Sequence, residues 1–379
     1  MRRVLIIAGE PSGDLHGACL MRSMKKLAPK LDFRGIGGTR MSGEGLHTVR
    51  HARDMNFMGF VEVVRHIPFI RETLRDLELL ISSWQPELAI LIDYPGFNLR
   101  LAKILKRANI PVMYYISPQI WAWHKNRVND VKAYVDRMVV LFAFEQDFYR
   151  QYGFEADFVG HPLIDIVKPS AEREPFRKRL GADSLPLIGL LPGSRVQEIN
   201  RILPHMIGAV RILNRNRDVV AALGCSEEIE EDTYRKYLEG TKIIPLRGET
   251  YDLMAHADAL MVTSGTATLE AGILGTPMVI VYRTSPLTYG IGKLLVNIEH
   301  IGMINIVAGS RVVPELWQGE VIAGNIAAEI EKFLDNPERV RAARNSLGIA
   351  REKLGGTGAS DRTAQVAVSL LTRHLNPLL

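Results

Sequence analysis

The sequence has few cysteines, no long hydrophobic run and little net charge. Its 379 residues include two cysteines, Cys19 in a predicted helix and Cys225 just after a predicted strand, which excludes a zinc knuckle or a disulfide framework. Apolar runs such as 87–92 and 277–282 have the length of a strand, well short of the roughly 20 residues of a membrane-spanning helix. The net charge of +5 is small and scattered, so no nucleic-acid partner is expected.

An export signal, a metal motif and a serine-hydrolase motif are also missing. Basic residues precede an apolar run at Met1–Ala8, as in a signal peptide, but the run is short and Gly9–Asp14 follows at once. We therefore expect a first strand and its loop. The histidines lack the spacing of metal ligands, and there is no G-x-S-x-G elbow. We expect no bound metal, no cofactor, and a cytoplasmic protein with unpaired thiols.

Short β-rich runs alternate with helical patterns in both halves of the chain, which is typical of α/β domains with a parallel sheet covered on both faces. A stretch rich in proline and charge interrupts this rhythm, which resumes with an apolar strand at 187–191. We therefore predict two similar Rossmann-like domains. Their predicted limits are 1–165 and 187–355, with a linker at 166–186 and a C-terminal helix at 356–379.

Loops that follow strands are the candidate sites, because open parallel sheets bind ligands beyond the carboxyl ends of their strands. Gly9–Asp14 follows the first predicted strand, and its glycines permit a tight turn and a close approach of a ligand to backbone N–H groups. The segment matches neither the dinucleotide fingerprint nor the P-loop. An ordinary turn with Asp14 as a helix N-cap explains it equally well.

Asp93 follows the predicted strand 88–92, which places its carboxylate on the ligand side of the sheet. Burial beside apolar strands would raise its pKa toward that of a useful general base. The alternative is that Asp93 caps the turn before the next helix, but Asn98 can do that unaided. We favour the catalytic interpretation, because polar loop residues on rigid scaffolds often carry function.

Two tryptophans, Trp121 and Trp123, lie in the segment that follows another predicted strand. They either pack in the core or line a cleft where a sugar ring stacks on them. Periodicity does not decide between these alternatives.

Two segments of the second half have the chemistry of an anion site. Gly193-Ser194-Arg195 follows a strand and combines backbone access, a hydroxyl and a guanidinium that fits phosphate. Ser264-Gly265-Thr266 opens a helix, so it presents N–H groups and the positive helix end to a diphosphate. Glu270 lies one turn beyond Thr266, where it could accept the hydroxyls of a ribose. The alternatives are a turn with a solvated arginine and an N-cap with a solvated glutamate.

In their joint order these motifs resemble the lipid-A-disaccharide synthase family, inverting nucleotide-sugar glycosyltransferases of the two-domain GT-B class. The resemblance runs essentially from end to end. Each motif is weak alone, whereas the order of all of them is specific. Gly96 departs from relatives that carry a second Asp there, which weakens a role for that position but leaves Asp93 intact. The motifs are Gly9–Asp14, Met58–Val63, Asp93–Asn98, Ser117–Trp123, Gly160–Pro162, Leu191–Arg195, Ser264–Glu270 and Asn305.

The resemblance implies two domains that face each other across a cleft, with the C-terminal helix packed back on the N-terminal domain. It implies that UDP-2,3-diacylglucosamine donates its sugar to the 6-hydroxyl of 2,3-diacylglucosamine 1-phosphate, giving a β-1,6-linked disaccharide 1-phosphate and UDP. Inversion at the anomeric carbon needs no metal, and Asp93 is the expected base. The expected nucleotide-binding residues are Gly193, Ser194, Arg195, Ser264, Gly265, Thr266, Glu270 and Asn305. The residues expected on the acceptor and sugar side are Glu10, Ser12, Gly13, Asp14, Gln119 and Trp121.

Two other functions use the same kind of fold. A UDP-N-acetylglucosamine 2-epimerase would use the uridine site without a lipid acceptor and would need further acid and base groups around the sugar. A non-catalytic nucleotide-sugar-binding protein would keep Glu270 and Arg195 but would not need Asp93.

The implied substrates are acylated, so a chain without a spanning helix must reach them from the membrane surface. Residues 57–71 mix bulky apolar groups with arginines, which favours a peripheral contact with the inner membrane. The alternative is that these apolar residues pack on the sheet. A homodimer is left open. The residues expected to contact lipid are Val61, Val64, Ile67 and Phe69.

Overall fold

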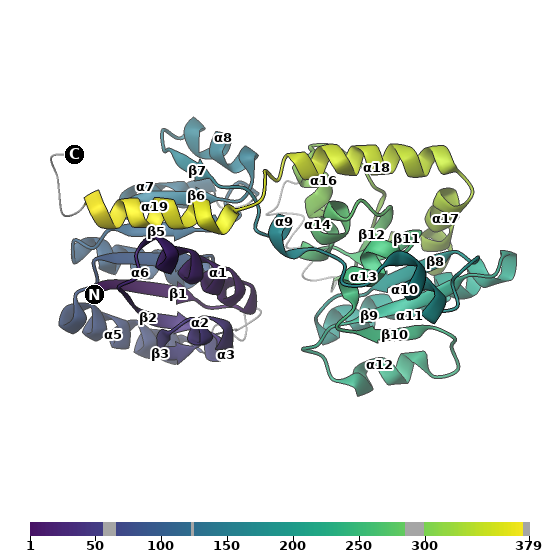
Figure 1. The fold of residues 1–379 in the computed structure, drawn as a ribbon, viewed down its shortest axis with the longest axis horizontal. Coiled ribbons are helices and arrows are strands. Elements are labelled where there is room, and N and C mark those ends of the chain that lie inside the picture. The colour runs from purple at the N-terminus through teal and green to yellow at the C-terminus, as the bar shows by residue number, and fades with distance from the viewer. Residues whose placement is uncertain (56–65, 123–124, 285–298, 374–379) are drawn as a thin grey trace. The chain divides into compact units, whose positions relative to one another are not determined.

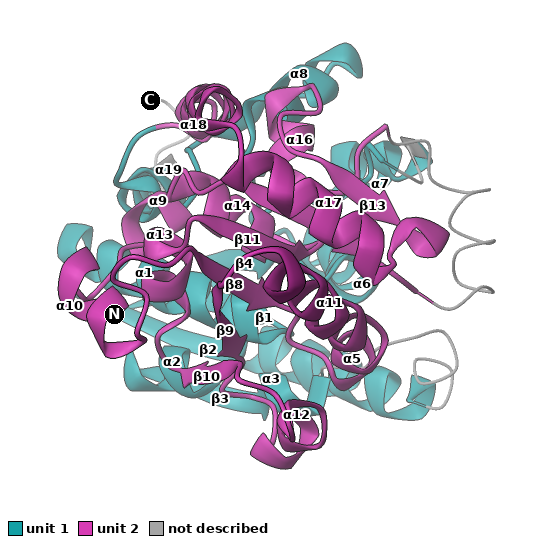
Figure 2. Cartoon of the chain, turned by 90° about the vertical axis from the view of Figure 1, so that its right-hand side faces the viewer, with its two compact units in different colours: residues 1–162, 356–379 teal, residues 163–355 magenta. Residues whose placement is uncertain are grey.

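The computed structural model of the chain describes residues 1–55, 66–122, 125–284 and 299–373. It divides into two compact units (Figure 2): unit 1 comprises Met1–Pro162 and Gly356–Leu379, and unit 2 comprises Leu163–Gly355. Each unit is built around its own parallel β-sheet, so the predicted α/β class with two Rossmann-like domains is confirmed. Among the described residues, no helix is long and apolar enough to cross a membrane.

Unit 1 has a seven-stranded sheet. Its strands are β1 (Arg2–Ala8), β2 (Leu31–Gly37), β3 (Leu46–His51), β4 (Leu88–Ile92), β5 (Val112–Tyr115), β6 (Arg137–Val140) and β7 (Ala156–Phe158), in the order β3-β2-β1-β4-β5-β6-β7. Its helices are α1 (Pro11–Leu27), α2 (Thr39–Gly43), α3 (Ala52–Met55), α5 (Ile67–Trp84), α6 (Pro95–Arg107), η1 (Lys125–Arg127), α7 (Val128–Tyr134), α8 (Ala143–Gln151) and α19 (Ala359–Arg373).

Both faces of this sheet are buried. Leu5 and Ile7 of β1 enter one hydrophobic core, and Val4 and Ile6 enter another on the opposite face. Successive side chains of a strand point to opposite faces, so a strand covered on both sides is apolar throughout. This burial explains why β1 is a continuous apolar run in the sequence.

Helix α19 joins unit 1 from the other end of the chain and packs against α1 (Figure 1). Ala364, Ala367 and Leu371 are buried in the core that α1 shares with β1. Two arginines fasten the helix to the sheet: Arg2 Nη1 donates to the carbonyl of Leu371 at 2.7 Å, and Arg362 Nε donates to a strand-end carbonyl at 2.8 Å.

Unit 2 has a six-stranded sheet. Its strands are β8 (Leu187–Leu191), β9 (Val220–Cys225), β10 (Ile244–Arg247), β11 (Ala259–Thr263), β12 (Met278–Tyr282) and β13 (Glu315–Trp317), in the order β10-β9-β8-β11-β12-β13. Its helices are α9 (Leu163–Ile166), α10 (Arg173–Arg179), α11 (Val196–Asn216), α12 (Glu231–Leu238), α13 (Thr250–His256), α14 (Thr266–Ile273), α16 (Met303–Ala308), η2 (Gln318–Glu320), α17 (Ala323–Leu334) and α18 (Pro337–Glu352).

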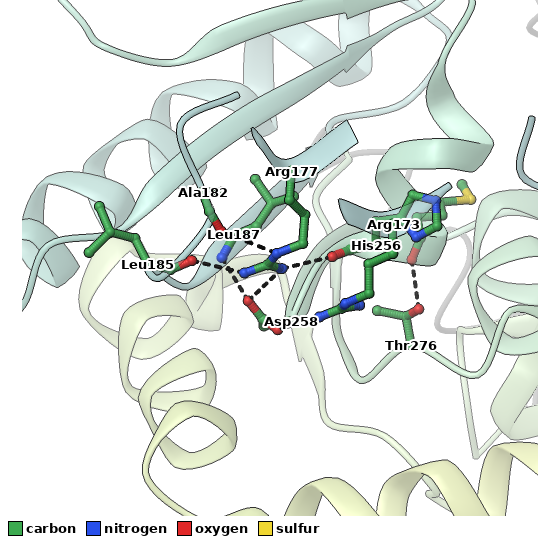
Figure 3. A network of polar contacts seen from close by, with 9 residues as sticks. Arg173, Arg177, Ala182, Leu185, Leu187, His256, Asp258 and Thr276 are labelled. Carbon is green, nitrogen blue, oxygen red and sulfur yellow. Dashed lines mark hydrogen bonds and ion pairs between the residues drawn. The ribbon is translucent and has the colours of Figure 1, made fainter. Parts of the chain in front are cut away.

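The segment 166–186, predicted as a linker, is a folded part of unit 2 that contains α10. Arg177 of this helix donates from Nη1 to the carbonyl of His256 at 2.9 Å and to the carboxylate of Asp258 at 3.0 Å, and its other nitrogens donate to two carbonyls of its own segment (Figure 3). Arg177, one of the charged residues that suggested a linker, therefore belongs to a polar network at the amino ends of β8 and β11.

Candidate active site

The loops after β1 and β4 begin side by side in unit 1. These two strands pair in parallel up to Ala8 and Ile92, and the strand order reverses between them. A reversal of this kind leaves a crevice at the carboxyl ends of the strands, where doubly wound sheets bind ligands. Glu10 and Asp93 are the first acidic residues of the two loops, so the structure brings these two predicted residues to one switch point.

Asp93 has a left-handed backbone, with φ of 46°, and Tyr94 follows with φ of 47°. Non-glycine residues rarely adopt this conformation, which persists where surrounding contacts enforce it. The carbonyl of Asp93 accepts the hydroxyl of Tyr114 at 2.6 Å and the amide of Asn98 at 2.7 Å. The N-cap of α6 is Tyr94, which makes no side-chain capping bond, so neither Asp93 nor Asn98 is the N-cap residue of this helix.

The Asp93 carboxyl is half-buried, and burial raises its pKa to about 7. The negative charge of Glu10 also raises it, while a hydrogen bond from the backbone of Tyr94 opposes the increase. A carboxylate with a pKa near the working pH combines a populated ionised form with basicity toward a hydroxyl. These properties are those of a general base.

Beside Asp93 lies a pocket of about 240 Å³ within unit 1. The ends of β5 and β6 and the start of α8 form its walls. Gln119 lines it from an exposed position. Two charged residues that also line the pocket, Arg127 and Glu145, were not predicted as site residues from the sequence. Glu145 looked like an ordinary first-turn glutamate, and only the fold shows that it faces Asp93.

The remaining predicted residues of the first loop lie in the first turn of α1. Pro11 starts α1, so Ser12 and Gly13 lie in its first turn, Ser12 exposed and Gly13 packed against Ala8. Asp14 is buried and accepts the backbone N–H groups of Gly38 at 2.7 Å and Met41 at 3.0 Å. Its carboxylate thus caps α2. The alternative that Asp14 is the N-cap of its own helix is wrong, because the N-cap of α1 is Glu10.

Trp121 packs by its edge against the ring of Phe144, with centroids 5.1 Å apart. It is partly buried and is not among the residues that line the pocket. Trp123 lies outside the described residues.

In unit 2 the equivalent switch point lies between β8 and β11. Gly193 has φ of 108°, and a Cβ there would lie 2.3 Å from an oxygen of Glu198, so the turn requires glycine. Ser194 and Arg195 are exposed on this turn. The guanidinium of Arg195 pairs with Glu198 at 3.1 Å, which holds the cation at the start of α11.

Helix α14 begins at the neighbouring strand end. Its N-cap, Gly265, has no side chain, so no side-chain cap covers the first N–H groups of the helix. Ser264 donates through Oγ to the carbonyl of Ile301 at 2.7 Å, which leaves Thr266 as the exposed hydroxyl of the turn. Glu270 accepts the hydroxyl of Tyr251 at 3.1 Å, and burial raises the pKa of its carboxyl.

Asn305, expected to bind nucleotide, is fully buried and has its side chain bonded within unit 2. Its amide nitrogen donates to the carbonyl of Val313 and the carboxylate of Glu315, both at 2.9 Å. Its oxygen accepts the N–H groups of Val312 at 3.0 Å and Val313 at 3.1 Å. These bonds make Asn305 a brace for residues 312–313 before β13, and Glu315 in turn accepts the N–H of Ile301 at 3.1 Å.

The residues expected to contact lipid lie partly inside and partly outside the described ranges. Val61 and Val64 lie outside the described residues. Ile67 begins α5 with 36% of its surface exposed, and Phe69 packs partly against the core. The apolar stripe further along α5, which includes Leu77, is buried in that core.

Within the described parts of the chain, no group of three or more His, Cys, Asp or Glu could hold a metal ion.

The fold matches solved nucleotide-sugar proteins over nearly its full length. A UDP-GlcNAc 2-epimerase from Neisseria meningitidis, bound to UDP-GlcNAc, superposes with a TM-score of 0.61 at 11% identity, covering 98% of this chain and 100% of that one. CalG4, the calicheamicin glycosyltransferase, superposes with a TM-score of 0.62 at 14% identity, covering 98% of this chain and 99% of that one. The class defined by the fold is thus the GT-B group of glycosyltransferases and related epimerases.

Sequence comparison narrows this class. The family model described as lipid-A-disaccharide synthetase matches residues 4–369. The lipid-A-disaccharide synthase of Geobacter metallireducens is 44% identical over 374 residues, which cover 98% of this chain and 97% of that protein. The chain belongs to the lipid-A-disaccharide synthase family, as its motifs predicted.

Proposed function

We propose that the protein transfers 2,3-diacylglucosamine from UDP to the 6-hydroxyl of 2,3-diacylglucosamine 1-phosphate. The carrying observation is Asp93: a carboxyl fixed in a left-handed turn at a switch point, with a pKa raised to about 7, beside a pocket. An epimerase or a binding protein has no need of a base directed at an acceptor hydroxyl. Family membership supplies the identity of the two sugars.

In the proposed reaction the Asp93 carboxylate takes the proton of the acceptor 6-hydroxyl. The freed oxygen forms a bond to the anomeric carbon of the donor as the bond from that carbon to the UDP oxygen breaks. A single displacement of this kind inverts the anomeric centre, and UDP leaves with the bonding electrons. No covalent enzyme intermediate is required.

Unit 2 is the proposed UDP-binding unit. The guanidinium of Arg195 and the uncapped N–H groups of α14 suit the negative charge that develops on the leaving diphosphate. Glu270 is proposed to accept the ribose hydroxyls, although its bond to Tyr251 already uses one of its oxygens. Gly193 permits close approach of the backbone, with Ser194, Gly265 and Thr266 beside the phosphates.

The lipid side is proposed to lie on unit 1, at the start of α5. Ile67 is exposed, and Arg71 and Arg75 are exposed on the same helix, a combination that suits the anionic surface of a bilayer. We therefore propose a peripheral association with the inner membrane, on its cytoplasmic side.

Incubation of the protein with the UDP-sugar, with and without the acylated acceptor, tests the function. A transferase releases UDP in step with a disaccharide and only when the acceptor is present. An epimerase changes the UDP-sugar without acceptor, and a binding protein changes neither compound. Mass spectrometry of the lipid fraction and chromatography of the nucleotides separate these outcomes.

A further inference from the structure

Glu145 is a buried carboxyl that the proposed reaction does not use. It lies in the first turn of α8, retains 3% of its surface exposed, and lines the same pocket as Asp93. Its Oε2 accepts the N–H of Phe142, the N-cap of the helix, at 3.2 Å. A glutamate at this helix position often serves only as a cap. Such a cap is normally solvated, however, whereas this one faces a pocket.

Ionisation of both carboxyls in one small pocket costs free energy. Each loses hydration, and each charge opposes the other, so the more buried group keeps its proton. Glu145 is buried, whereas Asp93 is half-buried. Burial raises the pKa of Glu145 to about 8. Hydrogen bonds from backbone N–H groups at the start of its helix oppose this rise, and the charge of Asp93 adds to it.

Other titratable groups surround this carboxyl. Tyr149 lies one turn further along α8, and burial raises its pKa; its hydroxyl lies 2.8 Å from that of Ser117. Burial raises the pKa of Tyr114, whose hydroxyl donates to the carbonyl of Asp93, and Arg127 is a cation that lines the pocket. Behind the N-cap, the ring of His161 contacts Phe142, and burial lowers the pKa of this histidine to about 3.

Charges on the neighbouring elements are paired with one another. Arg137 of β6 and Asp157 of β7 form an ion pair at 2.6 Å, and Asp147 and Arg150 pair on the exposed side of α8. Of the groups that face Glu145, Asp93 is thus the one whose titration changes the charge of the pocket near neutral pH.

We propose that Glu145 is an acceptor-positioning residue that works as a neutral carboxylic acid, donating a hydrogen bond to an oxygen of the acceptor sugar while Asp93 receives the proton of the attacking hydroxyl. This inference rests on the proposed function. One pocket thereby holds a donor and an acceptor of hydrogen bonds side by side, an arrangement that orients a sugar bearing several hydroxyls. The active form has Asp93 ionised and Glu145 protonated.

The pH dependence of kcat/KM for the acceptor, from about pH 5 to about pH 10, tests this proposal in the full-length enzyme. We expect a bell, with an acidic limb from Asp93 and an alkaline limb from Glu145, near the values of about 7 and about 8. Glu145→Gln keeps a donor and the cap, so it should retain turnover and acceptor KM within about threefold at neutral pH while losing the alkaline limb. Glu145→Ala should raise the acceptor KM by up to about tenfold.

The exposed Asp147 of the same helix provides the matched control, since Asp147→Asn should leave both limbs in place. A second measurement needs no activity: in an Asp93→Asn background, which removes the other titrating carboxyl of the pocket, infrared spectra at neutral pH should show a protonated carboxyl band that disappears on adding Glu145→Gln and persists on adding Asp147→Asn. An alkaline limb shared by wild type and Glu145→Gln, or absent from both, would overturn the proposal, as would a missing band. A band that is present while the wild-type enzyme forms no disaccharide overturns the proposed function instead.

Discussion

The hydroxyl of Tyr114 donates a 2.6 Å hydrogen bond to the main-chain carbonyl of Asp93. The tyrosine is fully buried on β5, and the aspartate directly follows the neighbouring strand β4, so a residue of β5 holds the turn that carries Asp93. This contact fixes a backbone conformation that costs on the order of 1–3 kcal/mol in an unsupported chain.

Tyr114→Phe should therefore weaken catalysis without touching a substrate. Loss of the hydroxyl leaves the carbonyl with the amide of Asn98 and costs about 1 kcal/mol of folding free energy. We expect kcat to fall several-fold because the carboxylate is less well fixed, while the Kd for UDP stays unchanged. Kinetics and calorimetry on the same preparation check this. Unchanged kcat would mean that the turn holds its shape without the tyrosine.

Asp93→Asn should abolish transfer and spare UDP binding. Loss of a general base typically costs about 10²–10⁴ in rate, and the amide is close to the carboxylate in size. UDP titration calorimetry provides the control for folding and for unit 2. If Asp93→Asn kept near-normal turnover, the base would be another group, with Glu10 the first candidate because its charge acts on Asp93.

The sequence predicts candidate loops after particular strands, and both sheets follow the doubly wound order, which brings these loops to the carboxyl ends of strands at the two switch points. It does not show the hydrogen bonds of single side chains whose partners come from a distant part of the chain. Asp14 caps α2, and Asn305 braces a turn through Glu315. The strand that carries Glu315 has three residues and shows no apolar run, so the sequence predicts neither this strand nor the contact between Glu315 and Asn305.

Arg195→Ala and Glu270→Ala should weaken UDP binding in different ways. Arg195 is assigned to the diphosphate, so its loss should harm UDP far more than uridine. Glu270 is assigned to the ribose, so its loss should harm both ligands to a similar extent. Calorimetry with the two ligands measures this difference, and equal losses for Arg195→Ala would contradict its assignment. Glu198→Gln, which removes the charge that pairs with Arg195, tests whether that ion pair positions the cation.

Glu145 also makes stability depend on pH. Its folded pKa is raised from 4.5 to about 8, so between these values the folded protein retains a proton that the unfolded chain has released. The associated stabilisation is present at pH below 4.5 and is lost as the pH rises through about 8. The stability of Glu145→Gln relative to wild type should therefore increase as the pH is raised from acidic to alkaline values. Denaturant unfolding of both proteins across this range checks the sign, and Asp147→Asn should run parallel to wild type.

The final prediction separates the lipid contact from the core on α5. Leu77 is fully buried, so Leu77→Ser should destabilise unit 1 by several kcal/mol, about the cost of removing a large apolar side chain from a core. Ile67 is 36% exposed at the start of the helix, so Ile67→Ser should leave the fold intact and reduce binding to vesicles that contain anionic lipid. Leu79 is 65% exposed toward the other end of the helix and serves as the control, since Leu79→Ser removes similar apolar surface away from the proposed contact. Equal vesicle binding by wild type and Ile67→Ser, with both folded, would place the membrane contact elsewhere.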